Sequence, residues 1–346
     1  MLGRKGMWLV GSVFTIAGVV LQLVAESTAL LMAGRLVLGV GVGGFSVTSP
    51  LDMGEVAPAQ LRAPMLMCWQ LTLSVSQIVA AGINRAMALE PATSFSFRFP
   101  IGFQLLFPIL VLAGLPFVPE SPRWLVARGK TDRAARSLRR LFPGRGRDRD
   151  REHPDPDPSI IAALQHHMDT ESRLHSGGGW TQLVTDRVER RKVVVSAGAL
   201  VAQQVNGIQW FYYFRTVFAR DIGLQDPFLM TLIVFSIQVV VVAAAVVLAD
   251  RLPRRRLLLA TTGIMTVSIF VVGCLGIPSH EVQNQVIGRV IISFVILEIV
   301  AFNFAWGPLG WTIASEMAVG RNRNKIYAVA VAAFWVTVWV TVSTLP

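Results

Sequence analysis

Nine apolar runs, each long enough to cross a lipid bilayer as a helix, constrain this chain more than any other feature. The hydrocarbon core of a bilayer is about 30 Å thick, which a helix of about 20 residues spans. The runs lie near residues 7–25, 29–50, 64–84, 99–118, 193–217, 227–249, 257–277, 286–313 and 326–345. Of the 346 residues, 53% are hydrophobic and only 15% are charged, whereas soluble domains carry about 25% charge. The sequence therefore predicts an all-α integral membrane protein with about nine transmembrane helices.

Lysine and arginine are distributed unevenly over the short segments that join these runs. With the N-terminus inside, segments 1–6, 52–63, 250–256 and 314–325 contain ten Lys and Arg residues, against three in the short outside segments. Cytoplasmic loops normally carry such an excess. We therefore expect a multi-pass protein with a cytoplasmic N-terminus. The same bias accounts for the net charge of +11 without a nucleic-acid partner.

The apolar runs form two groups, residues 1–118 and 193–346, which a polar insert at 119–192 separates. The two groups carry matching motifs in the same order. The matches are Gly3-Arg4-Lys5 with Pro253-Arg254-Arg255, Gly34-Arg35 with Gly288-Arg289, and Glu55 and Arg62 with Glu316 and Arg323. Parallel repeats of this kind build one large class of secondary transporters, in which the solute lies between the repeats. The sequence thus predicts an N-terminal half, a cytoplasmic linker and a C-terminal half.

The cytoplasmic linker is expected to contain short helices and a disordered stretch. Residues 131–141 begin with a Thr-Asp pair and place apolar residues at helical spacing, which predicts a helix. Residues 143–158 are rich in Arg, Asp and Pro, a composition typical of disorder. A second short helix is predicted from Ser159. Because acids interleave with the arginines, we interpret the insert as a solvated linker rather than a nucleic-acid-binding tail.

The polar residues of segment 203–214 lie inside an apolar run. The segment contains three glutamines, an asparagine and two tyrosines. Burial of such groups in hydrocarbon is unfavourable unless they have partners. One interpretation is that this side of the helix faces a polar cavity that binds a hydroxylated solute. The alternative is that these groups only bond to neighbouring helices.

Cysteine and histidine give no indication of a metal or a cofactor. Cys68 and Cys274 lie in separate apolar runs, so no disulfide framework follows. His166 and His167 are adjacent and would point in different directions on a helix. We expect neither a bound metal nor a cofactor.

Seven motifs, in order along nearly the whole chain, carry a resemblance to a known family. They are Gly3-Arg4-Lys5, Gly34-Arg35 with Gly39, Gly41 and Gly43, Glu55-Val-Ala-Pro58 with Arg62, Pro119-Glu-Ser-Pro-Arg-Trp-Leu125, Gln203-Gln204-x-x-Gly207, Asp250-Arg251-x-x-Arg254-Arg255, and Gly307-Pro308-x-x-Trp311 with Glu316. Together they resemble the sugar porters of the major facilitator superfamily, most closely the fungal hexose and maltose-type members. The resemblance implies a helical bundle that carries a sugar or polyol through the plasma membrane by alternating access, without enzymatic chemistry.

The resemblance also implies which residues bind the solute. They are Gln70, Gln203, Gln204, Gln209, Gln238, Asn303 and Trp311. Amides donate and accept hydrogen bonds at once, which suits sugar hydroxyls, and an indole face suits the C–H side of a sugar. Tyr213 and Pro308 are expected at gates. Phe334 and Val338 stand where the family tends to have Asn.

Charged residues at the inner face are expected to pair across the two halves and stabilise one conformational state. This set comprises Arg4, Glu55, Arg62, Glu120, Arg123, Asp250, Arg254, Glu316 and Arg323. Exposed ion pairs contribute about 0–1 kcal/mol each, which is enough collectively to bias a balanced equilibrium. The alternative is a positively charged rim with incidental acids. The same glutamate recurs in both halves, which favours the pairing.

The family has twelve spans, and this sequence matches the third to the eleventh, so helices 1, 2 and 12 are expected to be missing. In proton-coupled members, an acid in the first helix pairs with the arginine that matches Arg35. Glu298 is a second charge within a membrane run and a candidate substitute partner, although snorkelling or exposure to a cavity is an equal alternative. The sequence leaves open whether protons are coupled and whether the chain is a genuine short form.

Two other functions are compatible with these motifs. One is a transporter-like sensor that binds sugar without moving it; fungal sensors of this fold carry long cytoplasmic tails, which this sequence lacks. The other is a non-functional remnant.

Overall fold

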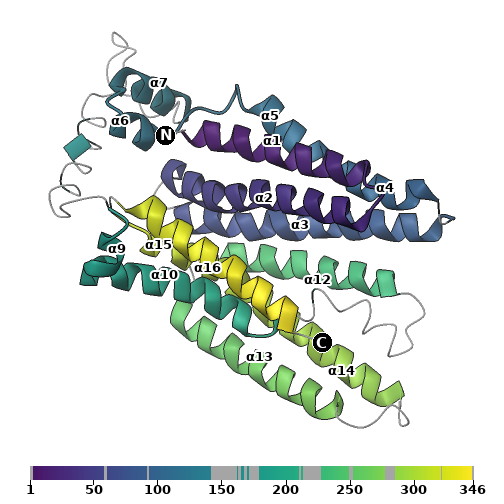
Figure 1. The fold of residues 1–346 in the computed structure, drawn as a ribbon. Coiled ribbons are helices and arrows are strands. Elements are labelled where there is room, and N and C mark those ends of the chain that lie inside the picture. Colours follow the sequence, from purple (N-terminus) through teal and green to yellow (C-terminus); the bar gives the residue numbers. More distant parts are fainter. Residues whose placement is uncertain are drawn as a thin grey trace. The chain divides into compact units, whose positions relative to one another are not determined.

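The computed structural model describes residues 3–57, 61–91, 93–141, 162, 165–166, 170, 179–209, 212, 227–248, 252–276, 285–320 and 322–344. Regular secondary structure within these residues is helical, without a β-strand (Figure 1). The helices are α1 (Arg4–Leu23), α2 (Thr28–Val56), α3 (Arg62–Leu89), α4 (Ser94–Phe103), α5 (Leu106–Gly114), α6 (Pro122–Ala127), α7 (Thr131–Leu141), α9 (Gln182–Thr185), α10 (Arg187–Val205), α12 (Pro227–Leu248), α13 (Arg254–Gly276), α14 (Gln285–Ala301), the π-helix η3 (Phe302–Trp306), α15 (Gly307–Met317) and α16 (Arg323–Thr344).

Eight helical segments in the described part of the chain are long and apolar enough to cross a membrane. They are 4–23, 28–56, 63–89, 94–114, 228–248, 254–275, 287–317 and 323–344. Each coincides with one of the predicted runs, so the all-α multi-pass membrane architecture is confirmed. The remaining predicted run, 193–217, coincides with α10 in its first part. Most of the residues that follow, 210–220, lie outside the described ranges.

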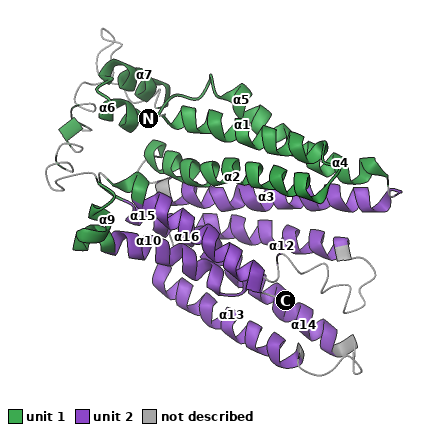
Figure 2. Ribbon diagram, in the orientation of Figure 1, with its two compact units in different colours: residues 1–59, 93–190, 319–325 green, residues 60–92, 191–318, 326–346 purple. Residues whose placement is uncertain are grey.

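Two compact units contain these helices (Figure 2). Unit 1 comprises residues 1–59, 93–190 and 319–325, and unit 2 comprises residues 60–92, 191–318 and 326–346. Helix α3 belongs to unit 2, although its sequence lies in the predicted N-terminal half. The division of the sequence into two repeat-related halves stays a prediction.

Unit 1 is built on the close pairing of α1 with α2. Ser27 caps α2 by accepting a hydrogen bond from the backbone N–H of Leu30 at 3.3 Å. Glycine allows the two helices to approach, since a Cβ at Gly18 would lie 2.5 Å from the backbone nitrogen of Leu38. Larger residues would force these helices apart.

The glycines of the second motif do not all serve this packing. A Cβ at Gly41 would lie 2.4 Å from Oγ1 of Thr15, so this glycine is required. No described atom lies within 4 Å of a Cβ placed at Gly39 or Gly43. Gly39 and Gly43 are therefore not required for the close packing of α1 on α2. They point away from the α1–α2 contact because only positions one helical turn apart share a face.

The predicted linker helix at residues 131–141 is confirmed as α7, with the predicted bounds. Ala134 is fully buried and packs with Leu125 and Val126 of α6. The predicted second linker helix and the stretch 143–158 fall almost entirely outside the described residues.

Unit 2 contains α3, most of α10, α12 to α15, and α16 from residue 326 onwards. Helix α3 packs against α12 and α15, and α13 packs against α14. Ser196 of α10 donates a hydrogen bond to the carbonyl of Ala314 in α15 at 2.8 Å. A buried apolar cluster that includes Val234, Met265 and Val295 joins α12, α13 and α14.

The long span 287–317 is interrupted near its middle. Residues 302–306 form a turn of π-helix, in which the N–H of Gly307 donates to the carbonyl of Phe302 instead of the residue four positions back. Pro308 follows and has no N–H to donate to the preceding turn. These two features leave carbonyl groups available to side chains, and the candidate site is built on them.

Candidate functional site

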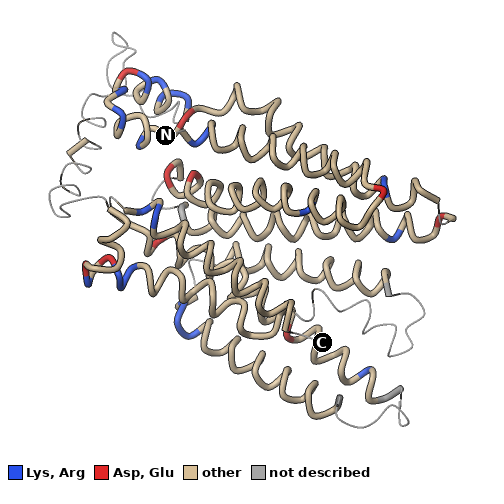
Figure 3. The backbone as a smooth tube through the Cα atoms, viewed as in Figure 1, with Lys and Arg blue, Asp and Glu red and all other residues tan. Residues whose placement is uncertain are grey.

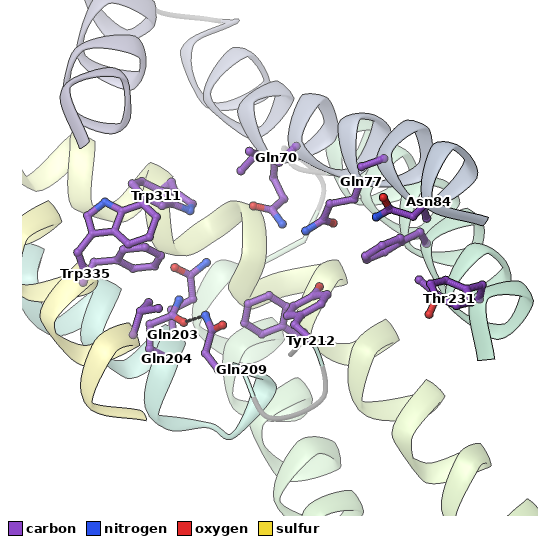
Figure 4. A pocket seen from close by; sticks show the side chains of 18 residues that line it. Gln70, Gln77, Asn84, Gln203, Gln204, Gln209, Tyr212, Thr231, Trp311 and Trp335 are labelled. Atoms are coloured by element: carbon purple, nitrogen blue, oxygen red, sulfur yellow. Dashed lines mark hydrogen bonds between the residues drawn. The ribbon is translucent and has the colours of Figure 1, made fainter. Parts of the chain in front are cut away.

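A cavity of about 590 Å³ lies within unit 2 (Figure 4). None of the eighteen described residues that line it is charged. The polar ones are Gln70, Gln77, Asn84, Gln203, Gln204, Gln209, Tyr212, Thr231 and Trp311. The apolar ones are Leu73, Ala80, Ala81, Phe228, Phe235, Phe302, Phe334, Trp335 and Val338. The described lining combines many neutral hydrogen-bonding groups with aromatic surfaces, and it offers no charge to an ionic ligand.

Helix α3 contributes one continuous polar stripe to the cavity. Gln70, Gln77 and Asn84 are spaced by seven residues, or about two helical turns, so they share one face. Figure 4 shows these three amides following one another along the helix. Only Gln70 was expected from the sequence. The seven-residue repeat of amides within an apolar run was the signal that would have predicted the other two.

Gln203, near the end of α10, is the most firmly held amide of the cavity. Its Nε2 donates to the carbonyls of Trp306 and Gly307, both at 2.9 Å. These carbonyls lie where the π-turn and Pro308 disturb the helix. The Oε1 of Gln203 is buried and has no hydrogen-bond partner among the described residues. The fixed amide thus keeps one acceptor without a partner, buried next to Gly310 and beside the cavity.

Two glycines of the Gly-Pro motif provide space for two amides of the cavity wall. A Cβ at Gly310 would lie 3.1 Å from Cδ of Gln203. A Cβ at Gly307 would lie 3.2 Å from Nε2 of Gln70. Both distances are tighter than ordinary contacts, so the absence of a side chain at these positions shapes the cavity.

The turn after α10 brings a second pair of amides together. Gly207 has a φ of +84°, which favours glycine, and the chain turns there. As a result Gln209 donates from Nε2 to Oε1 of Gln204 (Figure 4). The pair leaves donors and acceptors of both amides at the cavity wall.

Gln238 and Asn303, which the resemblance places at the solute, are fully buried and are not among the lining residues. The hydroxyl of Tyr212 joins them: Asn303 Nδ2 donates to it at 3.0 Å, and it donates to Oε1 of Gln238 at 3.1 Å. Asn303 also accepts from Gln70 at 3.4 Å, and Gln238 donates to Gln77 Oε1 at 2.7 Å. The two residues therefore form a layer behind the wall that orients the amides of α3.

Aromatic residues form the remaining wall. The Trp311 ring lies 6.3 Å from that of Trp69, edge to face, and 4.9 Å from that of Phe334. Trp335 and Val338 of α16 continue this apolar side. Polar groups thus come mainly from α3 and α10, and the described lining residues of α16 are aromatic or aliphatic, with the indole N–H of Trp335 as their one polar group. Of the expected gate residues, Pro308 lies buried behind Gln203, and Tyr213 lies outside the described residues.

Unit 1 holds the larger of two charge clusters. Arg4 pairs with Glu55 through two nitrogens, at 2.5 and 3.3 Å, and the side chains of Arg4 and Glu55 are 13% and 4% exposed. Ser121 Oγ donates to the same carboxylate at 2.6 Å. Arg323 lies 4.0 Å from it, and Asn324 accepts from Arg4 at 2.9 Å. Segment 319–325, which is distant in sequence, is thereby tied to the start of α1 and the end of α2.

Glu120 has a different role from the one expected of it. It accepts from the backbone N–H groups of Arg4 at 2.8 Å, Lys5 at 3.4 Å and Ser121 at 3.2 Å. The carboxylate therefore caps the N-terminus of α1, where the helix dipole favours negative charge. Gly3 is required beside it, because a Cβ there would lie 2.5 Å from Oε2 of Glu120.

The repeat predicted from the sequence has a counterpart in these ion pairs. Arg254 pairs with Glu316 at 2.5 Å in unit 2, as Arg4 pairs with Glu55 in unit 1. The second pair is more exposed, at 37% and 35% of the two side chains. Arg123 is the second residue of α6, two positions after Ser121. Asp250 and the side chain of Arg62 lie outside the description.

Arg35 and Glu298, the two membrane-run charges that the sequence suggests as candidate partners, have opposite environments. Arg35 of α2 is exposed, whereas Glu298 of α14 is fully buried. Neither oxygen of Glu298 has a hydrogen-bond partner among the residues that the structure describes. Glu298 lies on the same face of α14 as Ile291 and Val295 of the apolar cluster.

The helical membrane fold defines an integral, multi-pass membrane protein, and its unit 2 contains an amide-rich cavity whose described lining carries no charge. The whole chain, residues 1–346, matches the sugar (and other) transporter family. The chain belongs to this family.

Known relatives agree with this assignment. A probable glucose transporter of Neurospora crassa is 29% identical over 335 residues, which are 97% of this chain and 54% of that protein. A high glucose sensor of Saccharomyces cerevisiae is 28% identical, over 96% of this chain and 43% of the sensor. The chain spans about half the length of these relatives.

A solved structure shows the same fold. The proton:xylose symporter XylE of the major facilitator superfamily, bound to 6-bromo-6-deoxy-D-glucose, superposes with a TM-score of 0.80 and 22% identity. The match covers 98% of this chain and 71% of that one. The fold is therefore that of a major facilitator.

Proposed function

We propose that the protein that carries this chain transports a neutral polyhydroxylated solute, a sugar or a polyol, across the membrane by alternating access. The observation that carries this proposal is the cavity of unit 2, whose described lining is rich in amides and free of charge. Family membership and the glucose-related names of the relatives support the same solute class. No bond of the solute is made or broken in this process.

The chemistry of the wall fits hydroxyl groups better than other neutral groups. Each hydroxyl offers one donor and two acceptor positions, and an amide can satisfy both kinds. Gln203 offers a buried, unused acceptor, and the Gln204–Gln209 pair offers further groups close by. Trp311 supplies an apolar surface for the C–H face of the solute. A charged solute would be desolvated here without a compensating partner.

The interrupted helix η3–α15 supports a role in gating. A π-turn followed by Pro308 weakens the backbone hydrogen bonding of this span, so it bends more easily than a regular helix. Gln203 holds this weakened turn by donating hydrogen bonds to the carbonyls of Trp306 and Gly307. We propose that a solute hydroxyl at Oε1 of Gln203 changes this hold and so couples occupancy to bending.

The charge cluster of unit 1 supports a set of contacts that hold one conformational state closed at the cytoplasmic side. Arg323 and Asn324 come from the second half of the sequence, and Glu55 and Arg4 from the first. We propose that these contacts form in one state of the transport cycle and break in another, on the cytoplasmic side of the plasma membrane. An epitope at the N-terminus that is accessible only after permeabilisation would agree with this orientation.

Uptake measurements test the proposed function. Cells without hexose transporters, expressing the protein, are expected to take up at least one of labelled D-glucose, D-xylose and sorbitol. Gln203→Ala should abolish this uptake at unchanged surface expression, because it removes the acceptor and releases the bent helix. Gln22→Ala removes a similarly buried amide of α1, which among the described residues donates only to the carbonyl of Gly18, and should preserve uptake. Equal uptake by both variants would contradict the site.

A second candidate, a sugar sensor, is favoured by the 28% identity to a high glucose sensor. A sensor would bind the solute in the same cavity, and uptake would stay at background. Binding and uptake measured on the same preparation separate the two functions. Sensitivity of uptake to a protonophore would show whether protons are coupled.

A further inference from the structure

A second cleft, whose lining is basic where that of the unit 2 cavity is neutral, lies within unit 1. Its volume is about 720 Å³, and it is lined by α6, α7 and the residues where α1 begins. Six of its lining residues are basic, and Glu120 is the only acid among those described. The basic residues are Lys5, Lys130, Arg133, Arg136, Arg139 and Arg140. Figure 3 shows the corresponding blue segments on α7 and at the start of α1.

The single acid does not neutralise these cations. Glu120 already accepts three backbone N–H groups at the start of α1 and beside it. In the described part of the chain, Lys5, Lys130, Arg133 and Arg140 take part in no ion pair. Like charges held this close repel one another, so a structure that gathers them is stabilised by an anion.

Helix α7 places three of these cations on one exposed face. Arg133, Arg136 and Arg140 are separated by three and four residues, so they lie on one face of the helix and are exposed. The opposite face is fixed by Ala134, which is fully buried against α6. Ser137 Oγ donates to the backbone carbonyl of Glu120 at 2.5 Å and anchors the helix beside the cleft. The cationic face is therefore supported by a fixed scaffold.

The cleft adjoins the ends of two membrane-crossing segments. Lys5 lies in the first turn of span 4–23, and Pro119 follows the end of span 94–114. Trp124 and Leu125 add an apolar floor. Basic residues beside an indole at the end of a span are typical of the headgroup level of a bilayer.

We propose that this cleft binds a phosphate-bearing ligand. Guanidinium groups form bidentate hydrogen bonds with phosphate oxygens, and several of them here converge on one cleft. A phosphorylated lipid headgroup and a soluble phosphate ester share this chemistry. The ligand bridges α7 and the start of α1, and so stabilises the inner end of unit 1. This goes beyond solute transport and does not depend on it.

Thermal unfolding of the purified protein in detergent tests the proposal with defined probes. Inositol 1,4,5-trisphosphate should raise the melting temperature, because it binds only the folded state, and unphosphorylated inositol should not. The variant Arg133→Gln/Arg136→Gln/Arg140→Gln should bind the trisphosphate about 100-fold more weakly, since three cations are lost. A matched variant, Arg187→Gln/Arg255→Gln/Arg256→Gln, removes three exposed arginines outside the cleft and should bind like the wild type.

Two further arms identify the source of the phosphate. The first arm uses dioctanoyl phosphatidylinositol 4,5-bisphosphate. If it binds at least about tenfold more tightly than the trisphosphate, the ligand is a lipid, because the acyl chains add apolar contacts. Equal binding of the trisphosphate and ATP would indicate a soluble ester. The proposal is overturned if no phosphorylated probe shifts the melting temperature, or if the α7 variant binds as tightly as the matched control.

Discussion

The carboxamide of Gln203 fills the space that a side chain at position 310 would take, with only 3.1 Å between Cδ of Gln203 and a Cβ placed on Gly310. The same carboxamide holds the carbonyls of Trp306 and Gly307. The Gly-Pro motif of α15 and the paired glutamines of α10 are therefore one structural unit, in which the helix breaks and the amide occupies the break.

Replacement of Gly310 by alanine should displace this amide. The methyl group forces Gln203 to shift by a few tenths of an ångström, which weakens one hydrogen bond to the solute. Loss of one such bond costs about 0.5–1.5 kcal/mol, so the KM for uptake should rise by about two- to tenfold. Gly263→Ala in α13, where a Cβ meets no described atom within 4 Å, serves as the control. An unchanged KM in Gly310→Ala would show that the amide has room to move.

The apolar wall on α16 should control selectivity. Phe334 and Val338 line the cavity without offering a hydrogen bond. Val338→Asn adds a donor and an acceptor to this wall, so hexoses should gain affinity over their 6-deoxy analogues by up to about tenfold. Competition of the two sugars for uptake measures this preference. Val338→Ala only enlarges the cavity and should leave the ratio of the two affinities near that of the wild type. If both variants change this ratio similarly, selectivity depends on cavity volume alone.

The two equivalent ion pairs should contribute very differently to stability. Glu55 is almost fully buried with Arg4, so Glu55→Gln leaves a buried guanidinium without its counter-charge and should cost about 3–5 kcal/mol. Glu316 and Arg254 are each more than one third exposed, so Glu316→Gln should cost only about 0–1 kcal/mol. Chemical denaturation of the purified variants measures both. Equal losses would mean that solvent exposure does not separate the two pairs.

Loss of the Tyr212 hydroxyl alone, with the ring retained, should be enough to raise the KM for uptake. Tyr212→Phe removes the link between Asn303 and Gln238 and leaves two fully buried amides each short of one partner. Because Asn303 and Gln238 orient Gln70 and Gln77, the KM should rise by about tenfold, with expression retained. Addition of Gln238→Leu should then have a smaller effect than it has in the wild type. Fully additive effects would contradict a connected network.

The sequence predicted the membrane helices because length and hydropathy alone decide which segments can cross a bilayer. It also predicted α7, whose start signal and apolar spacing are local. Gln203, Gln204 and Trp311 were expected through the resemblance, and the structure places all three at the cavity.

Features that depend on three-dimensional neighbours were missed. Nothing local indicates that Glu120 caps α1 instead of joining an ion pair, because its three donors include residues more than one hundred positions away. Gln238 and Asn303 resemble binding residues by type, yet their neighbours place them behind the wall. The glycine motif also does not reveal that Gly41 faces α1 while Gly39 and Gly43 do not, because spacing along a helix does not tell which face meets a partner.

Equilibrium binding of labelled sugar to the purified protein tests the central claim most directly, because it does not require transport. For at least one of D-glucose, D-xylose and sorbitol, the wild type and Gln22→Ala should bind with equal Kd, and Gln203→Ala should bind about tenfold more weakly or worse. Binding of all three proteins with the same Kd, or no binding of any of these solutes to the wild type, would contradict the assignment of the unit 2 cavity as the solute site.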